Sequence, residues 1–203
     1  AAQHSQSPYS MFMNLGGMKI ILPSTPYDMK GLLKSAIRDD NPVISFEANR
    51  LLNVKGEVPD DDYTVPIGVA DVKRVGADIT VVAIAWMVHE ALAAAEIMDK
   101  EGVSVEVIDP RTLAPLDTDT ILKSVQKTGR LLVADEAGPT AGASAEFIAL
   151  ATEDDETFRA LKVPVRRVCA LNAPIPYSPV LEDHVFPNRN RIANGIRTVM
   201  SAG

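Results

Sequence analysis

A histidine close to the first residue lies among amide and hydroxyl side chains, in the run Gln3-His4-Ser5-Gln6-Ser7. Imidazole titrates near neutral pH, so a histidine whose neighbours fix its tautomer is suited to proton transfer. The same run is also typical of a polar segment that faces solvent, and a short motif does not separate the two interpretations. His4 is therefore a candidate catalytic residue with an open alternative.

A second candidate site follows the first long helix that the sequence predicts. Asp39, Asp40 and Asn41 come directly after that helix, and the carbonyl groups of Ala36 and Ile37 lie in its last turn. The last carbonyls of a helix have no partner within the helix, and hard cations bind such oxygens together with carboxylates and amides. A hydrated, polar helix end is the alternative interpretation.

Two adjacent carboxylates, Asp135 and Glu136, end a predicted strand over 131–134. Ligands and partner chains bind at the carboxyl ends of parallel strands, so this pair favours either catalysis or a salt bridge to a neighbouring subunit. The glycine-containing loop 138–146 follows, and it matches neither of the common phosphate-binding patterns. We expect that loop to be an ordinary strand-to-helix turn.

The elements that must position these residues alternate between strand-like and helix-like runs, which is typical of an α/β fold with a mostly parallel sheet. In the first part of the chain, the strands 18–22 and 43–46 flank a helix from Pro26 to about Arg38. Ser24 or Thr25 can cap that helix, and its spacing predicts a buried face made of Met29, Leu32, Leu33 and Ala36.

A proline- and glycine-containing stretch, 48–66, separates this part from a second unit, in which strands and helices alternate. The predicted strands are 79–85, 103–108, 131–134 and 163–168, and the predicted helices are 87–100, 119–127, 143–152 and 189–200. This pattern predicts a doubly wound sheet. The first part has too few strands for an independent domain. We therefore predict a partial domain over 1–62 and a complete one over 63–203.

Composition excludes several classes of protein. With 20 Lys and Arg against 27 Asp and Glu, the 203-residue chain carries a net charge of −7 and no basic cluster, which argues against a nucleic-acid partner. Its longest apolar run, 79–88, is about half of what a membrane span needs. A single cysteine, Cys169, favours a reducing, intracellular location. We assign structural roles to Cys169, His89 and His184, because no spacing indicates a metal site.

Seven stretches, taken together and in this order, resemble one enzyme family. They are QHSQS (3–7), LPSTPYDMKGLL (22–33), RDDNPVISFE (38–47), YTVPIGVADVKR (63–74), VEVIDPRTLAPLD (105–117), TGRLLVADEA (128–137) and PIPYSPVLED (174–183). Over nearly its whole length the chain resembles the β subunit of the thiamine-diphosphate-dependent 2-oxo acid dehydrogenase component. Pyruvate, acetoin and branched-chain enzymes share this pattern.

The resemblance implies the second half of a pyrimidine-binding domain followed by a transketolase-type C-terminal domain. It implies oxidative decarboxylation of a 2-oxo acid, with acyl transfer to a lipoyl group. Thiamine diphosphate with Mg²⁺ is shared between α and β subunits in this family. The implied partners are the α subunit, a second β subunit and the lipoyl acyltransferase core, in the bacterial cytoplasm or an equivalent intracellular compartment.

Some site residues also follow from the resemblance. His4 matches an active-site histidine that is implicated in orienting or protonating the bound intermediate and in acyl transfer. Ala36, Ile37, Asp39 and Asn41 match a turn that binds K⁺ in some members. The family's glutamate that protonates the aminopyrimidine precedes residue 1, so no cofactor-binding residue is assigned. We expect the chain alone to bind thiamine diphosphate weakly or not at all.

Two alternatives remain at this stage. The chain could be a non-catalytic interaction module of the transketolase C-terminal type. It could also be the tail of a transketolase or 1-deoxyxylulose-5-phosphate synthase relative.

Overall fold

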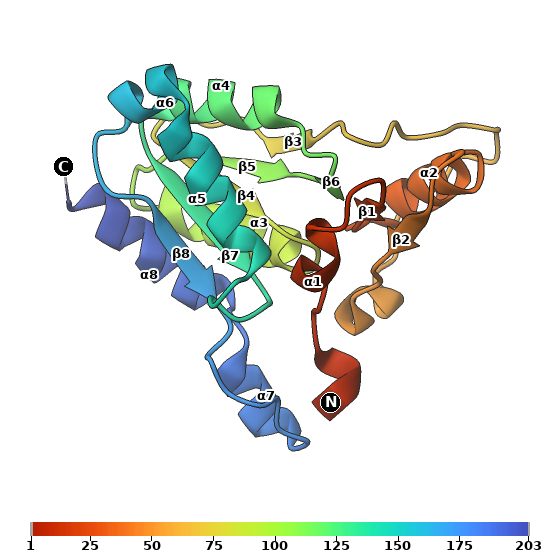
Figure 1. Cartoon of the computed structure of the whole chain (residues 1–203). Helices are drawn as coiled ribbons and strands as arrows, with labels where there is room; N and C mark the ends of the chain where they lie inside the picture. The colour runs from red at the N-terminus through yellow and green to blue at the C-terminus, as the bar shows by residue number, and fades with distance from the viewer. Residues whose placement is uncertain (1, 203) are drawn as a thin grey trace.

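The computed structural model describes residues 2–202, which form two sheets (Figure 1). In the smaller sheet, of order β2-β1-β6, β1 pairs in parallel with β2 and antiparallel with β6. Its strands are β1 (Lys19–Ile21), β2 (Val43–Ser45) and β6 (Thr112–Ala114). Because β6 comes from the second unit of the sequence, this sheet joins the two parts of the chain.

The larger sheet has the order β3-β5-β4-β7-β8, with β4, β5, β7 and β8 parallel and β3 antiparallel at one edge. Its strands are β3 (Asp71–Arg74), β4 (Ile79–Ala83), β5 (Val105–Asp109), β7 (Leu131–Asp135) and β8 (Arg166–Cys169). From β4, the first parallel strand in the sequence, the chain adds β5 on one side and then β7 and β8 on the other, so the strand order reverses beside β4. The predicted α/β class and doubly wound, mostly parallel sheet are confirmed.

Helices cover both faces of the larger sheet, as Figure 1 shows. One core packs α3 and α8 on the sheet, and the other packs α4 and α5 on its opposite face. The α-helices are α1 (Ser10–Met13), α2 (Pro26–Ile37), α3 (Met87–Asp99), α4 (Thr118–Thr128), α5 (Ala143–Glu153), α6 (Asp155–Ala160), α7 (Pro179–Val185) and α8 (Arg189–Met200). Two 3-10 helices are η1 (Ala2–Ser5) and η2 (Asn49–Asn53).

The predicted helix after Pro26 is confirmed, with the Thr25 side chain accepting a hydrogen bond from the Asp28 amide at 3.1 Å. Its predicted buried face is partly wrong. Leu33 is exposed, and the buried positions of α2 are Asp28, Gly31 and Leu32. The buried face of the helix includes a charged residue, Asp28. A prediction from the spacing of apolar residues cannot identify a face that contains a charge.

Short elements that lack an apolar pattern were not predicted. The stretch 48–66 contains η2, and the proline-rich loop before the last helix contains α7. The antiparallel edge strand β3 carries the sequence Asp-Val-Lys-Arg, with no buried residue. These elements are fixed by contacts with distant parts of the chain rather than by local periodicity. The division at residue 62 stays a prediction.

A buried ionic cluster fastens the first part of the chain to the larger sheet. Lys73 Nζ lies 2.9 Å from Asp28, 2.7 Å from Asp71 and 3.7 Å from Asp109. Arg111 lies 2.6 Å from Asp28 and 2.9 Å from Asp71. Asp28 comes from α2, whereas the other four residues belong to β3, the end of β5 and the residues that follow it. Buried charges of opposite sign at this joint hold α2 in one place.

Replacing Gly76 with alanine is expected to lower the free energy of unfolding by about 1–3 kcal/mol, the usual cost of overpacking. A Cβ at this position would lie 2.2 Å from both the Glu106 nitrogen and the Val105 carbonyl carbon, which are backbone atoms of the neighbouring strand β5. Gly138→Ala is the control, because a Cβ there meets nothing within 4 Å. Urea denaturation compares the two, and equal stabilities would contradict the prediction.

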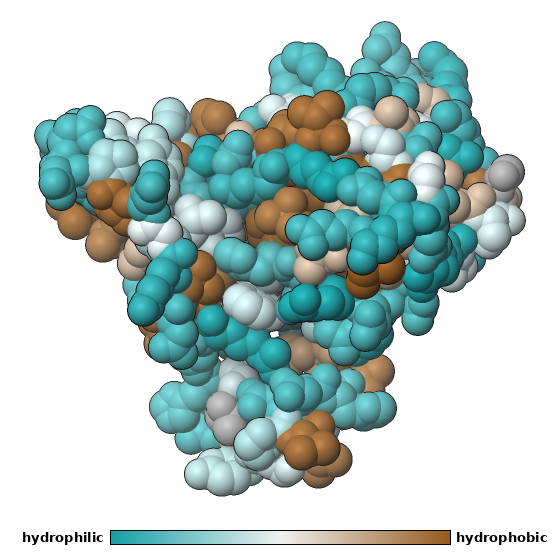
Figure 2. Space-filling model, turned by 180° about the vertical axis from the view of Figure 1, so that it is seen from behind, coloured by the Kyte–Doolittle hydropathy of each residue, from teal (hydrophilic) through white to brown (hydrophobic). Residues whose placement is uncertain are grey.

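The back of the molecule is mainly hydrophilic, with hydrophobic colour at the tip of the projection that α7 forms (Figure 2). Three apolar side chains in or just before α7 are largely exposed: Tyr177, Val180 and Leu181. Across residues 2–202, no helix has the length and apolar character needed to cross a bilayer.

Candidate functional site

The N-terminal segment is fastened to the carboxyl end of β7 at two points. The Ser7 hydroxyl donates a hydrogen bond to Glu136 Oε1 at 3.1 Å, and the Tyr9 hydroxyl donates to Asp135 Oδ1. Tyr9 is fully buried, and its ring meets the Phe46 ring edge-on at 5.9 Å. The carboxylate pair that the sequence indicated therefore binds a segment of its own chain.

His4 lies in η1, directly before these anchors. Its side chain is exposed, and its backbone carbonyl accepts a hydrogen bond of 2.6 Å from the Asn49 amide of η2. A small cavity of about 40 Å³ opens beside it. Among the residues that line this cavity are His4, Ser7, Glu47, Arg50, Glu136 and Phe186. The structure thus brings the predicted histidine and Glu136 to one cavity between the two parts of the chain.

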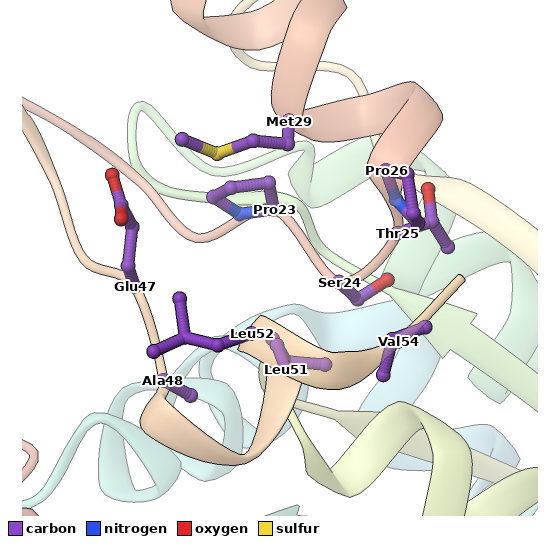
Figure 3. A pocket seen from close by; sticks show the side chains of 10 residues that line it. All are labelled: Pro23, Ser24, Thr25, Pro26, Met29, Glu47, Ala48, Leu51, Leu52 and Val54. Atoms are coloured by element: carbon purple, nitrogen blue, oxygen red, sulfur yellow. The ribbon is translucent and has the colours of Figure 1, made fainter. Parts of the chain in front are cut away.

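A larger, mainly apolar cavity of about 250 Å³ adjoins this one and shares Glu47 and Ala48 with it. Figure 3 shows Pro23 and Met29 on one side of it and Leu51 and Leu52 of η2 on the other, with the Glu47 carboxylate at one end. Because β1 and β2 are parallel and both end here, the cavity lies where α/β sheets usually bind ligands.

Burial dominates the electrostatics of the carboxylates at the end of β7. It raises the pKa of Glu136 to about 7, although the Ser7 hydroxyl opposes the rise, and neighbouring Asp135 adds to it. Burial also raises the pKa of Asp135. Arg50 is held between the Asp183 carboxylate at 2.7 Å and the Phe186 ring at 5.1 Å. A carboxyl group with a pKa near 7 changes its protonation state around neutral pH.

The turn predicted to bind K⁺ lies at the end of α2 and lines neither of these cavities. Lys19 Nζ lies 2.5 Å from Asp39 Oδ2, and the Asn41 backbone and side-chain amides donate to Asp39 Oδ1 at 2.9 and 3.0 Å. The Lys19 ammonium, with these amides, lowers the pKa of Asp39 to about 2. The carbonyl of Ala36 accepts the Asp39 amide at 3.3 Å. Within residues 2–202, no group of three His, Cys, Asp or Glu side chains is placed to hold a metal.

The other residues considered in the sequence lie apart from this site. His89 is within 2.8 Å of the Ser24 carbonyl and stacks on Trp86, and His184 is exposed on α7. Cys169 is buried, with its sulfur 3.4 Å from the Ser144 hydroxyl. The loop 138–146 is a strand-to-helix turn, as expected, and Gly142 precedes α5.

Sequence reasoning missed Glu47 and Arg50, which line the small cavity. Glu47 directly precedes the stretch 48–66 that was interpreted as a linker, and Arg50 lies within it. Their signal was weak, because two isolated charges near a proline-rich loop are more often solvated.

The comparisons with known proteins agree with this arrangement. Residues 68–192 match the family model described as the transketolase C-terminal domain, and residues 1–55 match the transketolase pyrimidine-binding domain. The chain belongs to the transketolase C-terminal domain family. His4, η2 and the strands β1 and β2 thus fall in the pyrimidine-binding match, whereas β6, Asp135 and Glu136 fall in the C-terminal match.

Relatives of this family cover most of the chain. It is 46% identical to the acetoin:2,6-dichlorophenolindophenol oxidoreductase subunit beta of Bacillus subtilis, over 96% of this chain and 56% of the relative. It is 42% identical to the pyruvate dehydrogenase E1 component subunit beta of the same bacterium, over 97% of this chain and 60% of the relative. The chain therefore spans a little over half the length of these relatives.

A solved structure, described as a split gene transketolase in an inactive beta4 tetramer, matches 95% of this chain and 60% of its own. Its TM-score is 0.79 at 21% identity, which shows a shared fold. The resemblance to dehydrogenase β subunits read from the sequence is confirmed by the relatives.

Proposed function

We propose that this chain is part of the β subunit of a thiamine-diphosphate-dependent dehydrogenase component that acts on a 2-oxo acid or on acetoin. The observation that carries the proposal is the placement of His4 beside Glu136, in a cavity at the junction of the two family domains. The names of the relatives support the same assignment.

The residues around the cavities fit the reacting end of thiamine diphosphate better than its charged end. An imidazole and two carboxyl groups beside an apolar wall suit a ring whose reaction needs proton transfers. The described residues provide no metal-binding cluster for the Mg²⁺ of the diphosphate. We therefore assign that end of the cofactor to the α subunit. When bound, the cofactor supplies the nucleophile and the electron sink for cleavage next to the carbonyl group.

In this site His4 would donate or accept a proton at its imidazole, because that side chain is exposed to the cavity and its backbone is held by Asn49. Glu47 and Arg50 would orient polar groups of the substrate from η2 and its approach. The acyl group would then pass to a lipoyl disulfide, which is reduced as the acyl carbon is oxidised. The exposed apolar side chains of α7 would meet a partner subunit, the α subunit or a second β subunit.

Assembly with an α subunit tests the proposal. The β subunit that contains this chain is co-expressed with its α subunit, and turnover is measured with pyruvate, branched-chain 2-oxo acids and acetoin, using a dye as electron acceptor. Turnover of one of these substrates that requires thiamine diphosphate is the expected result. An assembled complex without turnover of any of them would contradict the proposal and favour a non-catalytic module. Such a protein is expected inside the cell, in the bacterial cytoplasm or an equivalent compartment.

We also propose that the turn formed by Ala36, Ile37, Asp39 and Asn41 binds K⁺. Lys19 already neutralises Asp39, so the ion must displace the lysine and its affinity is expected to be low. At a concentration ten times the dissociation constant, an ion stabilises the fold by about 1.4 kcal/mol, which corresponds to a rise in melting temperature of about 3–6 °C. Exchange of NaCl for KCl should produce this rise, and Asp39→Asn should remove it, whereas Asp40→Asn should not. Equal melting temperatures in the two salts would refute K⁺ binding.

A further inference from the structure

We propose that Glu136 is a positioning residue that holds the His4 segment, residues 2–8, against the end of β7 by accepting the Ser7 hydrogen bond. The inference rests on the proposed function, in which His4 is the catalytic histidine. Ser7 lies three residues after His4 and 129 positions before Glu136, so this contact ties the segment that carries the histidine to the C-terminal domain. The Ala2 amide adds a longer bond of 3.5 Å to the Pro176 carbonyl.

The hydrogen bonds of the two neighbouring carboxylates differ in a way that singles out Glu136. Asp135 accepts from the amides of Ala137 and Ser144 as well as from Tyr9, so it also stabilises the turn within its own domain. Within residues 2–202, the Glu136 side chain accepts its hydrogen bond from Ser7. Loss of the Glu136 carboxyl should therefore free the His4 segment without unfolding the turn.

The His4 segment has an anchor on each side of the Ser7 contact. Tyr9, directly after the segment, donates a hydrogen bond to Asp135, and the Asn49 amide donates one to the His4 carbonyl. Glu136 lies between these two anchors and lines the same cavity as His4. Without it, residues 5–8 would have no side-chain hydrogen bond to β7, and the imidazole position would spread over several conformations.

The titratable and charged groups that face Glu136 come from four parts of the chain. Asp135 lies on β7, Arg50 lies on η2, and His4 and Glu47 line the cavity from η1 and the end of β2. Because burial and Asp135 raise its pKa to about 7, the carboxyl is protonated for much of the time at neutral pH. A glutamine at this position keeps the neutral form and an oxygen that accepts from Ser7.

Four variants in the assembled enzyme test the role of this contact: Glu136→Ala, Glu136→Gln, Ser7→Ala and the double variant Ser7→Ala/Glu136→Ala. Glu136→Ala should lower kcat about tenfold, with KM changed less than twofold, because the histidine is misplaced while substrate binding remains. Glu136→Gln should keep at least half of kcat. The double variant should be no slower than the slower single variant, since both remove one interaction. Glu153→Gln on the exposed side of α5 is the control and should leave kcat unchanged.

Hydrogen–deuterium exchange of the 203-residue chain gives a second readout that needs no activity. In Glu136→Ala, exchange in the segment 2–8 should rise about fivefold, while β7 and α5 exchange as in the parent chain. An unchanged segment, or a kcat equal to the parent's in active enzyme, would overturn the inference. An assembled parent enzyme that turns over no substrate refutes the proposed function instead, and the exchange result then decides alone whether Glu136 holds the segment.

Discussion

Replacing His4 with alanine is expected to lower kcat of the assembled enzyme by about 10²–10⁴-fold, the usual contribution of a proton-transferring group. The free energy of unfolding should change by less than about 0.5 kcal/mol, because surface side chains without specific contacts contribute little. The His4 side chain is exposed, and the hydrogen bond from Asn49 uses the backbone carbonyl of His4, which alanine retains. Steady-state kinetics and urea denaturation of the same preparations provide the two measurements.

Two further variants separate proton transfer from simple occupancy of the cavity. Glutamine in place of His4 keeps a polar side chain of similar reach that does not titrate, so His4→Gln should be nearly as slow as His4→Ala. Gln3→Ala changes the exposed neighbour in the same segment and should retain most of the activity. If His4→Ala and Gln3→Ala had equal kcat values, His4 would have no catalytic role.

Replacing Lys73 with methionine is expected to lower the free energy of unfolding by about 3–5 kcal/mol, the usual cost of leaving buried charges without a partner. Its ammonium group contacts three carboxylates, and the side chains of Asp28 and Asp109 are fully buried. The methionine fills a similar volume, so the loss measures the charge rather than a cavity. Denaturation in urea at pH 7.5 measures it, and Lys123→Met is the matched control, since the Lys123–Asp119 pair is exposed.

The deficit of the Lys73 variant should also depend on pH, with a sign set by Asp109. Burial raises the pKa of Asp109 to about 6, above that of an unfolded aspartate, so the folded form binds the proton more tightly. The stabilisation from this group is complete below about pH 4 and is lost as the pH rises through 6. Without Lys73 the carboxylate is harder still to ionise, so the deficit should be smaller at pH 5 than at pH 7.5. A pH-independent deficit, or one no larger than that of Lys123→Met, would contradict this account of the joint.

The sequence by itself determined the elements whose patterns are local. Short strand-like runs predicted the central strands β4, β5 and β7, and 3.6-residue periodicity predicted α3. Caps and breakers set several ends, such as Asp117 before α4 and Gly129, in the left-handed region, after it. The seven motifs identified the family, which the relatives confirm. These features depend on residues near one another in the chain, so a single sequence is enough to read them.

Only the tertiary structure decided how the two parts of the chain meet. No local pattern indicates that Asp28 is buried against Lys73 and Arg111, or that β6 leaves its own domain to pair with β1. The sequence suggested His4 and noted Asp135 and Glu136, but not that Ser7 and Tyr9 would bind those carboxylates. The free energy of such contacts depends on burial and on partners more than one hundred residues away. Patterns among neighbouring residues in the sequence predict neither of them.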